Sequence, residues 1–153
     1  GLARAPRDWR ARLAHQQRAL GQPRFVAVAY ADHERVDAPG VDAVLEWAGA
    51  HHAAALLIDT AVKDGRGLFD WQSEAALRAT LGRAKAHDLP VALAGSLREA
   101  DLPRVRALGP HIAAVRGAAC ERSDRRGGIT AARVRALRAA LQAPAVAIDR
   151  RAG

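Results

Sequence analysis

Residues 56–65 read LLIDTAVKDG, an apolar run that ends in a carboxylate and leads, four positions later, to a lysine. The apolar part, 56–58, has the composition of a strand that is buried on both faces, as strands of parallel sheets are. Asp59 and Lys63 are ionisable and prefer water, so the strand must end here. The stretch predicts a buried strand followed either by a charged surface turn or by the mouth of an active site.

Strand-like and helix-like segments alternate along the rest of the chain. Apolar residues at helical spacing predict helices, and short apolar or β-branched runs predict strands. In chain order the predicted elements are a helix at 7–20, a strand at 24–30, a helix at 39–52, a strand at 54–59, a helix at 71–88, a strand at 90–95, a helix at 97–109, a strand at 111–117 and a helix at 129–142. This alternation is typical of an α/β fold with a parallel sheet and right-handed crossovers.

Four such units fit either half of a βα barrel or a small doubly wound sheet. The glycine pattern G-x-G-x-x-G of dinucleotide-binding folds follows none of the predicted strands. A full barrel takes about 250 residues, whereas this chain has 153. We expect one domain, a partial barrel or a small sheet, at 1–143 and a C-terminal tail at 144–153.

The chain is basic, with a net charge of +8 from 24 basic and 16 acidic residues, and only Lys63 and Lys85 are lysines. The arginines are scattered at helical spacing, without the interleaved aromatic residues that stack on bases. The charge therefore favours anionic small molecules over nucleic acid. The sequence has no apolar run of membrane-spanning length, and its single cysteine, Cys120, agrees with a reducing compartment, so we expect no membrane contact and a cytoplasmic location.

Polar or small residues stand where each predicted strand stops, in the segments YADH, DTAVKDG, AGS and RGAAC. Ligands of parallel α/β folds bind beyond the carboxyl ends of the strands. Asp59 and Lys63 share a face there if the extended path continues. A carboxylate stabilises a charged ammonium, so Lys63 suits a proton donor or a phosphate clamp better than a resting Schiff-base nucleophile. A surface salt bridge is the alternative.

The loops after the third and fourth strands combine glycine with groups that bind anions. Gly95 and Gly117 allow close backbone approach, Ser96 adds a hydroxyl and Arg116 a charge. These features favour a phosphate site, and the alternative is a pair of tight turns. No metal-ligand spacing such as C-x-x-C or H-x-x-E-H occurs, so we expect no metal, and Cys120 reads as an inert buried thiol.

Four segments in this order and spacing carry a resemblance to a known family: AYAD (29–32), LIDTAVKDGRGLFDWQS (57–73), ALAGSL (92–97) and AVRGAAC (114–120). Together they resemble the (5-formylfuran-3-yl)methyl phosphate synthase family. The resemblance implies a TIM-barrel fold and an enzyme, a lyase, that condenses two molecules of glyceraldehyde 3-phosphate. Phosphate and water are lost, and the product is a precursor of methanofuran-type one-carbon cofactors.

The resemblance also implies site residues. The family works through a lysine Schiff base, without a metal or other cofactor, and moves protons with further lysines and aspartates. Asp59 and Lys63 match its Asp-Thr-Ala-x-Lys-Asp-Gly motif and are therefore expected to be catalytic. The residues expected to bind phosphate or substrate are Gly95, Ser96, Arg116, Gly117 and Asp32.

The family's Schiff-base lysine belongs to an Asp-x-Lys motif on the first strand, and this chain has no Asp-x-Lys. The sequence therefore resembles the last four βα units of a barrel. Two alternatives to an active enzyme stay open. One is a phosphate-binding half-barrel without turnover, whose open sheet edges invite self-pairing into a homo-oligomer. The other is a basic interaction module that uses its arginine-covered helices.

Overall fold

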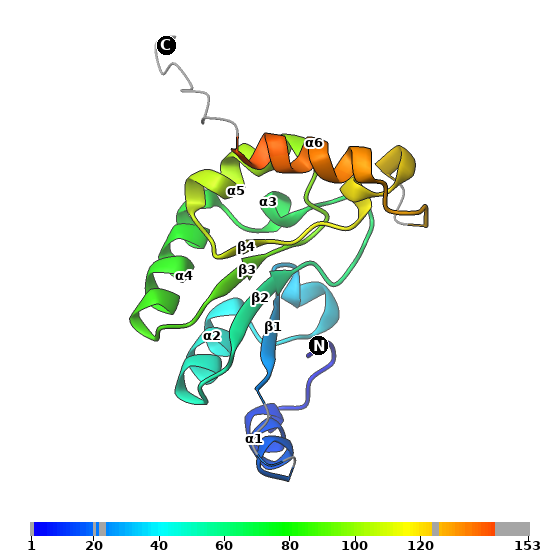
Figure 1. Ribbon diagram of the computed structural model, residues 1–153. Helices are drawn as coiled ribbons and strands as arrows, with labels where there is room; N and C mark the ends of the chain where they lie inside the picture. The colour runs from blue at the N-terminus through cyan, green and yellow to red at the C-terminus, as the bar shows by residue number, and fades with distance from the viewer. Residues whose placement is uncertain (1, 20, 22–23, 124–125, 143–153) are drawn as a thin grey trace, which may run out of the picture.

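The computed structural model describes residues 2–19, 21, 24–123 and 126–142 (Figure 1). The tail predicted at 144–153 lies outside the described residues. Within them, strands and helices alternate in the predicted order. The structure is therefore of the α/β class.

Four strands form one sheet: β1 (Val26–Tyr30), β2 (Ala55–Asp59), β3 (Val91–Leu93) and β4 (Ile112–Ala113). All pairings are parallel, and the strand order β1-β2-β3-β4 equals the order in the sequence. Consecutive parallel neighbours need a crossover between them, and helices supply it. This arrangement is compatible with half of a TIM-type barrel.

In the part of the chain that the structure describes, five helices of at least seven residues accompany the sheet: α1 (Trp9–Ala19), α2 (Val41–Ala50), α4 (Glu74–Ala86), α5 (Leu102–Leu108) and α6 (Ala131–Gln142). Shorter helical turns lie between them: η1 (His33–Val36), α3 (Leu68–Trp71), η2 (Glu99–Asp101), η3 (Gly117–Ala119) and η4 (Glu121–Ser123). In Figure 1, α1 lies beyond the beginning of β1, and α6 lies at the opposite end of the molecule. None of the described helices has the length and hydropathy needed to cross a membrane.

The prediction of one continuous helix at 71–88 was wrong over its first turn. Gln72 has extended backbone, with φ −125° and ψ 125°, and it separates the short helix α3 from α4. The Ser73 hydroxyl then accepts the N–H of Ala76 at 3.1 Å and begins α4. Serine favours this N-terminal position because its oxygen satisfies a backbone N–H that the helix leaves unpaired. The predicted helix therefore divides into two.

The last strand and its preceding helix are also shorter than predicted. The helix predicted at 97–109 begins as a regular helix only at Leu102, after the turn η2. The strand predicted at 111–117 pairs only at Ile112 and Ala113. From Gly117 the chain turns into η3 instead. The loop after β4 therefore starts earlier than the apolar pattern indicated.

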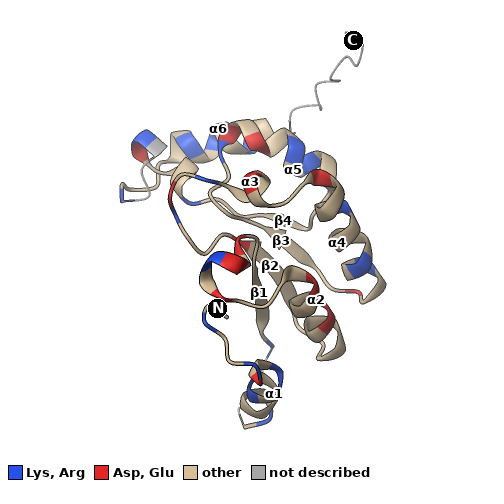
Figure 2. Ribbon diagram, turned by 180° about the vertical axis from the view of Figure 1, so that it is seen from behind, with Lys and Arg blue, Asp and Glu red and all other residues tan. Residues whose placement is uncertain are grey.

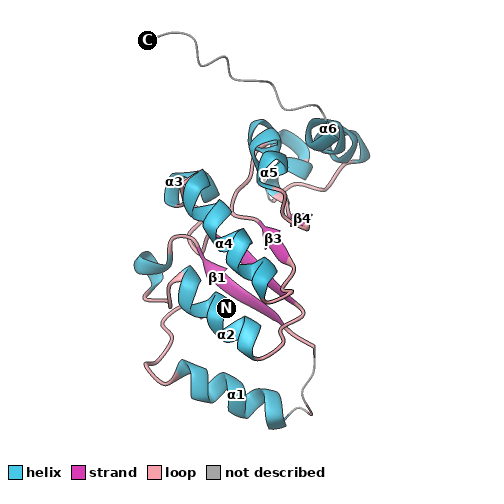
Figure 3. Ribbon diagram, turned by 90° about the vertical axis from the view of Figure 1, so that its left-hand side faces the viewer, coloured by secondary structure: helices cyan, strands magenta, loops and turns pink. Residues whose placement is uncertain are grey.

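One face of the sheet carries the hydrophobic core. Ala27 and Ala29 of β1 and Leu56 and Ile58 of β2 are buried there with side chains of the helices, among them Val44, Leu45 and Leu77. Figure 3 shows α2 and α4 in front of the strands on this face. Packing against the helices on this face fixes the strands. Because the strands are parallel, their carboxyl ends lie at the same end of the sheet.

Basic residues are spread over the outer helices. Figure 2 shows Lys and Arg on several helices rather than gathered on one face. Several arginines are paired with acidic side chains: Arg12 with Asp8, Arg83 with Asp42 and Glu46, and Arg104 with Glu74. The predicted scatter of the arginines is confirmed for the described residues.

Candidate active site

A cleft of about 540 Å³ lies beyond the carboxyl ends of β2, β3 and β4. Its walls come from the loops that follow these three strands and from the first turn of α6. Six of the seven predicted site residues line it: Asp59, Lys63, Gly95, Ser96, Arg116 and Gly117. The parallel sheet thus brings together segments that lie more than fifty positions apart in the sequence.

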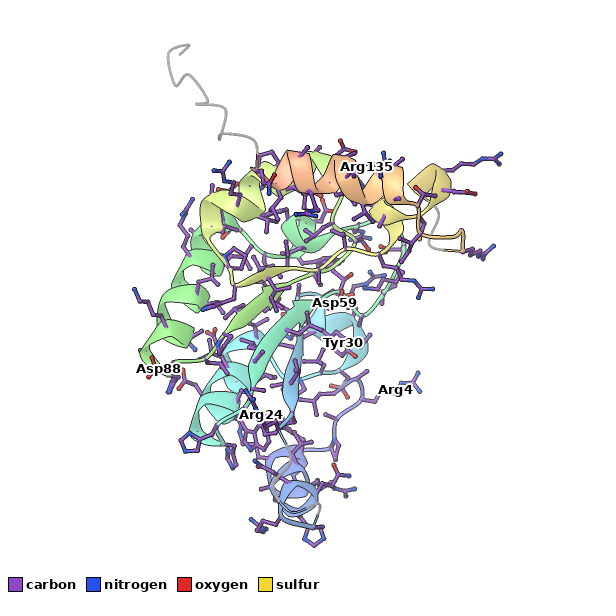
Figure 4. All side chains as sticks on the ribbon, viewed as in Figure 1. Arg4, Arg24, Tyr30, Asp59, Asp88 and Arg135 are labelled. Carbon is purple, nitrogen blue, oxygen red and sulfur yellow. The ribbon has the colours of Figure 1, made fainter. Side chains whose placement is uncertain are left out.

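Asp59 is the last residue of β2, and Figure 4 shows it beside Tyr30, its partner in β1. Its carboxylate accepts a hydrogen bond of 2.8 Å from the Lys63 ammonium, and both side chains are 30% exposed. The sequence analysis expected Asp59 and Lys63 to share one face of an extended chain. The strand instead ends at Asp59, and the two side chains meet across the turn that follows it. The turn gives the same pairing by a different route.

Thr60 completes the surroundings of the Lys63 amine. The ammonium also donates to the Thr60 hydroxyl at 3.0 Å and to the Thr60 carbonyl at 2.5 Å. An ammonium has three protons, and all three therefore have acceptors. Thr60 is itself only 1% exposed, so these acceptors are fixed. Sequence reasoning did not single out Thr60, because a threonine after a strand is common.

Asp32 lies after β1 and does not line the cleft. It is 2% exposed, and its two oxygens accept the backbone N–H groups of Ala61 and Val62 at 2.6 and 3.0 Å. A buried carboxylate needs such donors to offset its lost hydration. Asp32 therefore anchors the loop that carries Lys63.

The loop after β3 has left-handed backbone at two successive residues. Gly95 has φ +98° and Ser96 has φ +50°. A Cβ at Gly95 would lie 3.0 Å from Thr60 Cγ2 and 3.1 Å from Thr60 N. Glycine is therefore required twice here, for its backbone angle and for the close approach to Thr60. The close packing of Gly95 against Thr60 holds the loop after β3 next to the loop that carries Lys63.

Arg116 precedes η3, and its exposed side chain lines the cleft. Among the described residues its guanidinium has no hydrogen-bond or ion-pair partner, unlike the other cleft cations. Its carbonyl accepts the thiol of Cys120 at 3.3 Å, and Cys120 is 1% exposed. The expected buried thiol is confirmed. The cleft thus offers one guanidinium that is available to an anion.

Two further cleft residues, Arg98 and Arg133, were missed by sequence reasoning. Arg98 donates to the Gly65 carbonyl at 2.6 Å and so links the loops after β3 and β2. Arg133 of α6 pairs with Glu99 at 3.3 Å and donates to the Ala118 carbonyl at 3.0 Å. In the sequence both arginines belong to a scattered basic pattern, and no spacing distinguishes them. Only the fold reveals that they join the loops around the cleft.

The sequence of this chain matches a known protein family. The sequence model of a family described as 4-HFC-P synthase matches residues 2–138. This chain belongs to that family. The family resemblance seen in the sequence is confirmed.

Three curated relatives named (5-formylfuran-3-yl)methyl phosphate synthase illustrate the similarity. The one from Methanopyrus kandleri is 50% identical over 119 residues, which are 77% of this chain and 50% of the relative. Those from Methanocaldococcus jannaschii and Methanothermobacter thermautotrophicus are 40% and 38% identical over 103 residues, 67% of this chain and 44% of each relative. The chain spans about half the length of the curated relatives it matches.

In this member of the 4-HFC-P synthase family, a charged cluster borders the cleft beside Gly65. Asp64 accepts the backbone N–H of Arg66 at 3.1 Å and the Arg35 guanidinium at 2.9 Å. The N–H of Arg66 and the Arg35 side chain hold the pKa of Asp64 below its ordinary value. The loop between Lys63 and α3 is therefore tied down by its own charges.

The described residues contain no cluster of three or more histidine, cysteine, aspartate or glutamate side chains with metal-site geometry. The groups that line the cleft are an ammonium, two carboxylates (Asp59 and Glu99), a hydroxyl, glycine backbone and guanidinium groups. Such groups can transfer protons and bind oxyanions.

Proposed function

We propose that this chain is the carboxy-terminal half of a TIM-barrel Schiff-base lyase that condenses two molecules of glyceraldehyde 3-phosphate. The product would be (5-formylfuran-3-yl)methyl phosphate, formed with loss of phosphate and water, for the biosynthesis of methanofuran-type cofactors. One observation carries the proposal. A single cleft combines a lysine–carboxylate pair at 2.8 Å with glycine- and arginine-containing loops after the next two strands.

The phosphate of the substrate is proposed to bind between the loops after β3 and β4. Gly95 and Ser96 line the cleft, and their backbone N–H groups donate to no acceptor within the described residues. Arg116 and Gly117 face the same cleft, and Arg116 supplies a guanidinium that suits phosphate oxygens. A phosphate here would satisfy backbone donors and a positive charge at once.

Lys63 is proposed to act as a proton donor. Ring formation removes hydroxyl and phosphate groups, and each leaves more easily when it receives a proton. The ammonium has three protein acceptors, so a substrate oxygen would replace one of them. Asp59 holds the amine in place before the transfer, and the neutral amine would take up a proton from water afterwards.

Asp32 is proposed to act on the substrate through the Lys63 loop. The side chain is 2% exposed, which shields it from a substrate, and its two oxygens accept the backbone N–H groups of Ala61 and Val62. A buried carboxylate loses much by giving up such a donor. Its contribution is therefore to hold the loop, and with it the position of the amine.

The Schiff-base lysine is proposed to come from outside this chain. Only Lys63 and Lys85 are lysines, and the first has three acceptors in the structure. Lys85 lies exposed in the last turn of α4, away from the residues that line the cleft. A nucleophilic amine must be neutral and must face the substrate. Neither lysine of this chain suits the role of Schiff-base nucleophile, and this favours a second candidate function, a phosphate-binding half-barrel without turnover.

An assay with and without the missing half would test these proposals. The chain is incubated with glyceraldehyde 3-phosphate, alone and with the amino-terminal half of the Methanopyrus kandleri relative, and the furan aldehyde is measured by mass spectrometry. We expect product only in the mixture, with borohydride trapping of substrate on the added half. Phosphate binding by the chain without product in either sample would support the second candidate function.

Binding to neither phosphate nor the added half would contradict both functions. Salt-sensitive binding to nucleic acid with no phosphate affinity would instead support a basic interaction module. The cytoplasmic location and the absence of metal, cofactor, membrane and nucleic-acid partners stay predictions.

A further inference from the structure

Thr60 contacts both members of the lysine–carboxylate pair. It follows the last residue of β2 and is 1% exposed. Its hydroxyl and its carbonyl accept hydrogen bonds of 3.0 and 2.5 Å from the Lys63 ammonium. Its backbone N–H donates at 2.7 Å to the same Asp59 oxygen that accepts Lys63 at 2.8 Å. One buried residue therefore holds the amine and the carboxylate together.

The methyl group of Thr60 faces the loop after β3. A Cβ at Gly95 would lie 3.0 Å from Thr60 Cγ2, which leaves no room between the two residues. On its other side Gly95 is fixed by its carbonyl, which accepts the N–H of Leu68 at 2.8 Å. The Thr60 methyl therefore sets how closely the backbone at Gly95 approaches the end of β2.

We propose that Thr60 is a positioning residue that fixes the proton donor and the phosphate loop relative to one another. Its hydroxyl holds Lys63, and its methyl holds the loop that contains Gly95. Because Thr60 is buried, it acts on the substrate only through these two neighbours. The inference rests on the functions proposed above for Lys63 and for the loop after β3.

The hydroxyl suits both protonation states of the amine. In the proposed transfer, a bond between Lys63 Nζ and a proton breaks, the proton joins the leaving oxygen of the substrate, and a lone pair remains on Nζ. The Asp59 carboxylate and the Thr60 carbonyl only accept hydrogen bonds, so neither binds that lone pair. The Thr60 hydroxyl can rotate and donate to it. It therefore keeps the amine in place until water returns a proton.

Thr60→Val removes the hydroxyl and keeps the shape of the side chain. In the enzyme completed by the amino-terminal half of the Methanopyrus kandleri relative, kcat should fall by about 10- to 100-fold, because the ammonium loses a fixed acceptor. The dissociation constant of the chain for inorganic phosphate should stay at the wild-type value, because the methyl that faces Gly95 is kept. Steady-state assays and titration calorimetry measure the two quantities. A wild-type kcat in this variant would overturn the inference.

Thr60→Ser makes the opposite change, since it keeps the hydroxyl and removes the methyl. It should retain most of the wild-type kcat at saturating substrate. The dissociation constant for inorganic phosphate should rise by about fourfold, the equivalent of one buried methyl group. An unchanged phosphate affinity, or a loss of kcat as large as in Thr60→Val, would contradict the division of the side chain into two roles.

The matched control is Thr80→Val. Thr80 is also buried, and its hydroxyl donates to the Ala76 carbonyl at 3.0 Å within α4, away from the residues that line the cleft. The same chemical change there should alter neither kcat nor phosphate affinity. Thermal unfolding compares the stability of the variants. Equal losses of kcat in Thr80→Val and Thr60→Val would show an effect on folding and would overturn the positioning role.

The position of the amine can also be measured without the reaction. Lys63 and Lys85 are the two lysines of the chain, so lysine labelled with ¹³C and ¹⁵N gives two side-chain signals in NMR spectra. The ammonium protons of Lys63 should exchange with water more slowly than those of the exposed Lys85, because all three have fixed acceptors. Thr60→Val should speed the exchange at Lys63 alone, and Thr60→Ser should not.

These spectra separate the inference from the proposed function. If no sample makes the furan aldehyde, the proposed function fails, but the exchange at Lys63 still decides whether Thr60 holds the amine. Exchange at Lys63 that is the same in Thr60→Val and the wild type would overturn the inference, even in an active enzyme. If Thr60→Val does not fold, Thr60→Ser decides: slow exchange at Lys63 with weakened phosphate binding supports the inference, and fast exchange contradicts it.

Discussion

Lys63 donates to three acceptors that two neighbouring residues, Asp59 and Thr60, supply. This arrangement fixes the amine at the end of β2. Arginine would keep the charge, but a guanidinium does not give up a proton under these conditions. The proposed proton transfer therefore depends on the amine itself and not on positive charge alone.

Lys63→Arg should lower the kcat of the complemented enzyme by about 10²- to 10⁴-fold, the usual contribution of a positioned acid. The dissociation constant for inorganic phosphate should change little, because the charge is kept. Steady-state assays and titration calorimetry measure the two quantities. Lys85→Arg, on the exposed side of α4, is the control and should leave both unchanged. An unaltered kcat in Lys63→Arg would remove Lys63 from proton transfer.

Arg116→Ala should raise KM by roughly 10- to 100-fold, because a hydrogen bond to a charged group contributes about 1.5–3 kcal/mol. The guanidinium of Arg116 has no partner within the described residues, so its removal disturbs no internal contact. Arg135→Ala, on the exposed side of α6 (Figure 4), is the matched control. The two KM values are compared in the same assay, and equal values would exclude Arg116 from the phosphate site.

Six of the seven site residues proposed from sequence line one cleft. They could be found because each follows an apolar strand, and parallel strands end at a common edge. Asp32 follows the same rule but faces the loop after β2, because its carboxylate accepts two backbone N–H groups there. Arg98 and Arg133 were not predictable, since their contacts depend on how the loops fold over the cleft.

At the scale of single elements, the loop after β3 is held by a glycine that fits closely against Thr60. Gly95→Ala should lower the stability of the protein by roughly 1–3 kcal/mol, the cost of a strained backbone conformation. It should also displace Thr60, which accepts the Lys63 amine. Thermal unfolding measures the loss.

Gly82→Ala is the opposite case and serves as the control. Gly82 lies within α4, and a Cβ there meets no atom within 4 Å. Alanine favours a helix over glycine by about 1 kcal/mol, so this variant should be more stable than the wild type. Destabilisation of similar size in both variants would show that the close contact between Gly95 and Thr60 does not cause the loss of stability in Gly95→Ala.

The loop between β2 and α3 should respond to pH through Asp64. Its pKa is lowered, mainly by the N–H of Arg66 and then by Arg35. A lowered pKa means that the group stabilises the fold above the ordinary value of 3.8 and that this contribution is lost as the pH falls through the folded-state value. Asp64→Asn should therefore be less stable than the wild type at neutral pH.

The difference between Asp64→Asn and the wild type should vanish at pH values well below 3.8. Urea unfolding at several pH values measures it. Asp8→Asn removes an exposed ion pair with Arg12, formed between the residue before α1 and its first turns, and is a surface control with little expected effect. A stability difference for Asp64→Asn that persists at low pH would contradict the electrostatic explanation.

The order and type of the elements were predictable because the alternation of apolar and helical patterns is strong. The ends of the helices and strands were not predictable where local hydrogen bonds decide them. Ser73 begins α4 because its hydroxyl accepts a backbone N–H, and Gln72 before it is extended. The strand after Gly109 ends early because the chain turns at Gly117. These local contacts compete with an apolar pattern that continues past the real ends.

For the whole molecule, we expect the charge of +8 to form no nucleic-acid surface, because several arginines among the described residues are paired with carboxylates. We expect affinity for duplex DNA no tighter than about 10⁻⁵ M near physiological salt, within the range of non-specific binding. Fluorescence anisotropy with a labelled duplex measures it. A tighter affinity that falls steeply with salt would favour the interaction module over the enzyme.

The strand order in the sheet repeats the order in the chain, so each strand contacts the one made just before it. This order keeps paired strands one βα unit apart in the sequence, the shortest separation that parallel neighbours joined by a helix allow, although such pairing is still non-local and slow compared with helix contacts. On the ribosome, each new βα unit would find its docking site already present. The cleft would then be assembled wall by wall, and the Arg116 side would be the last to form.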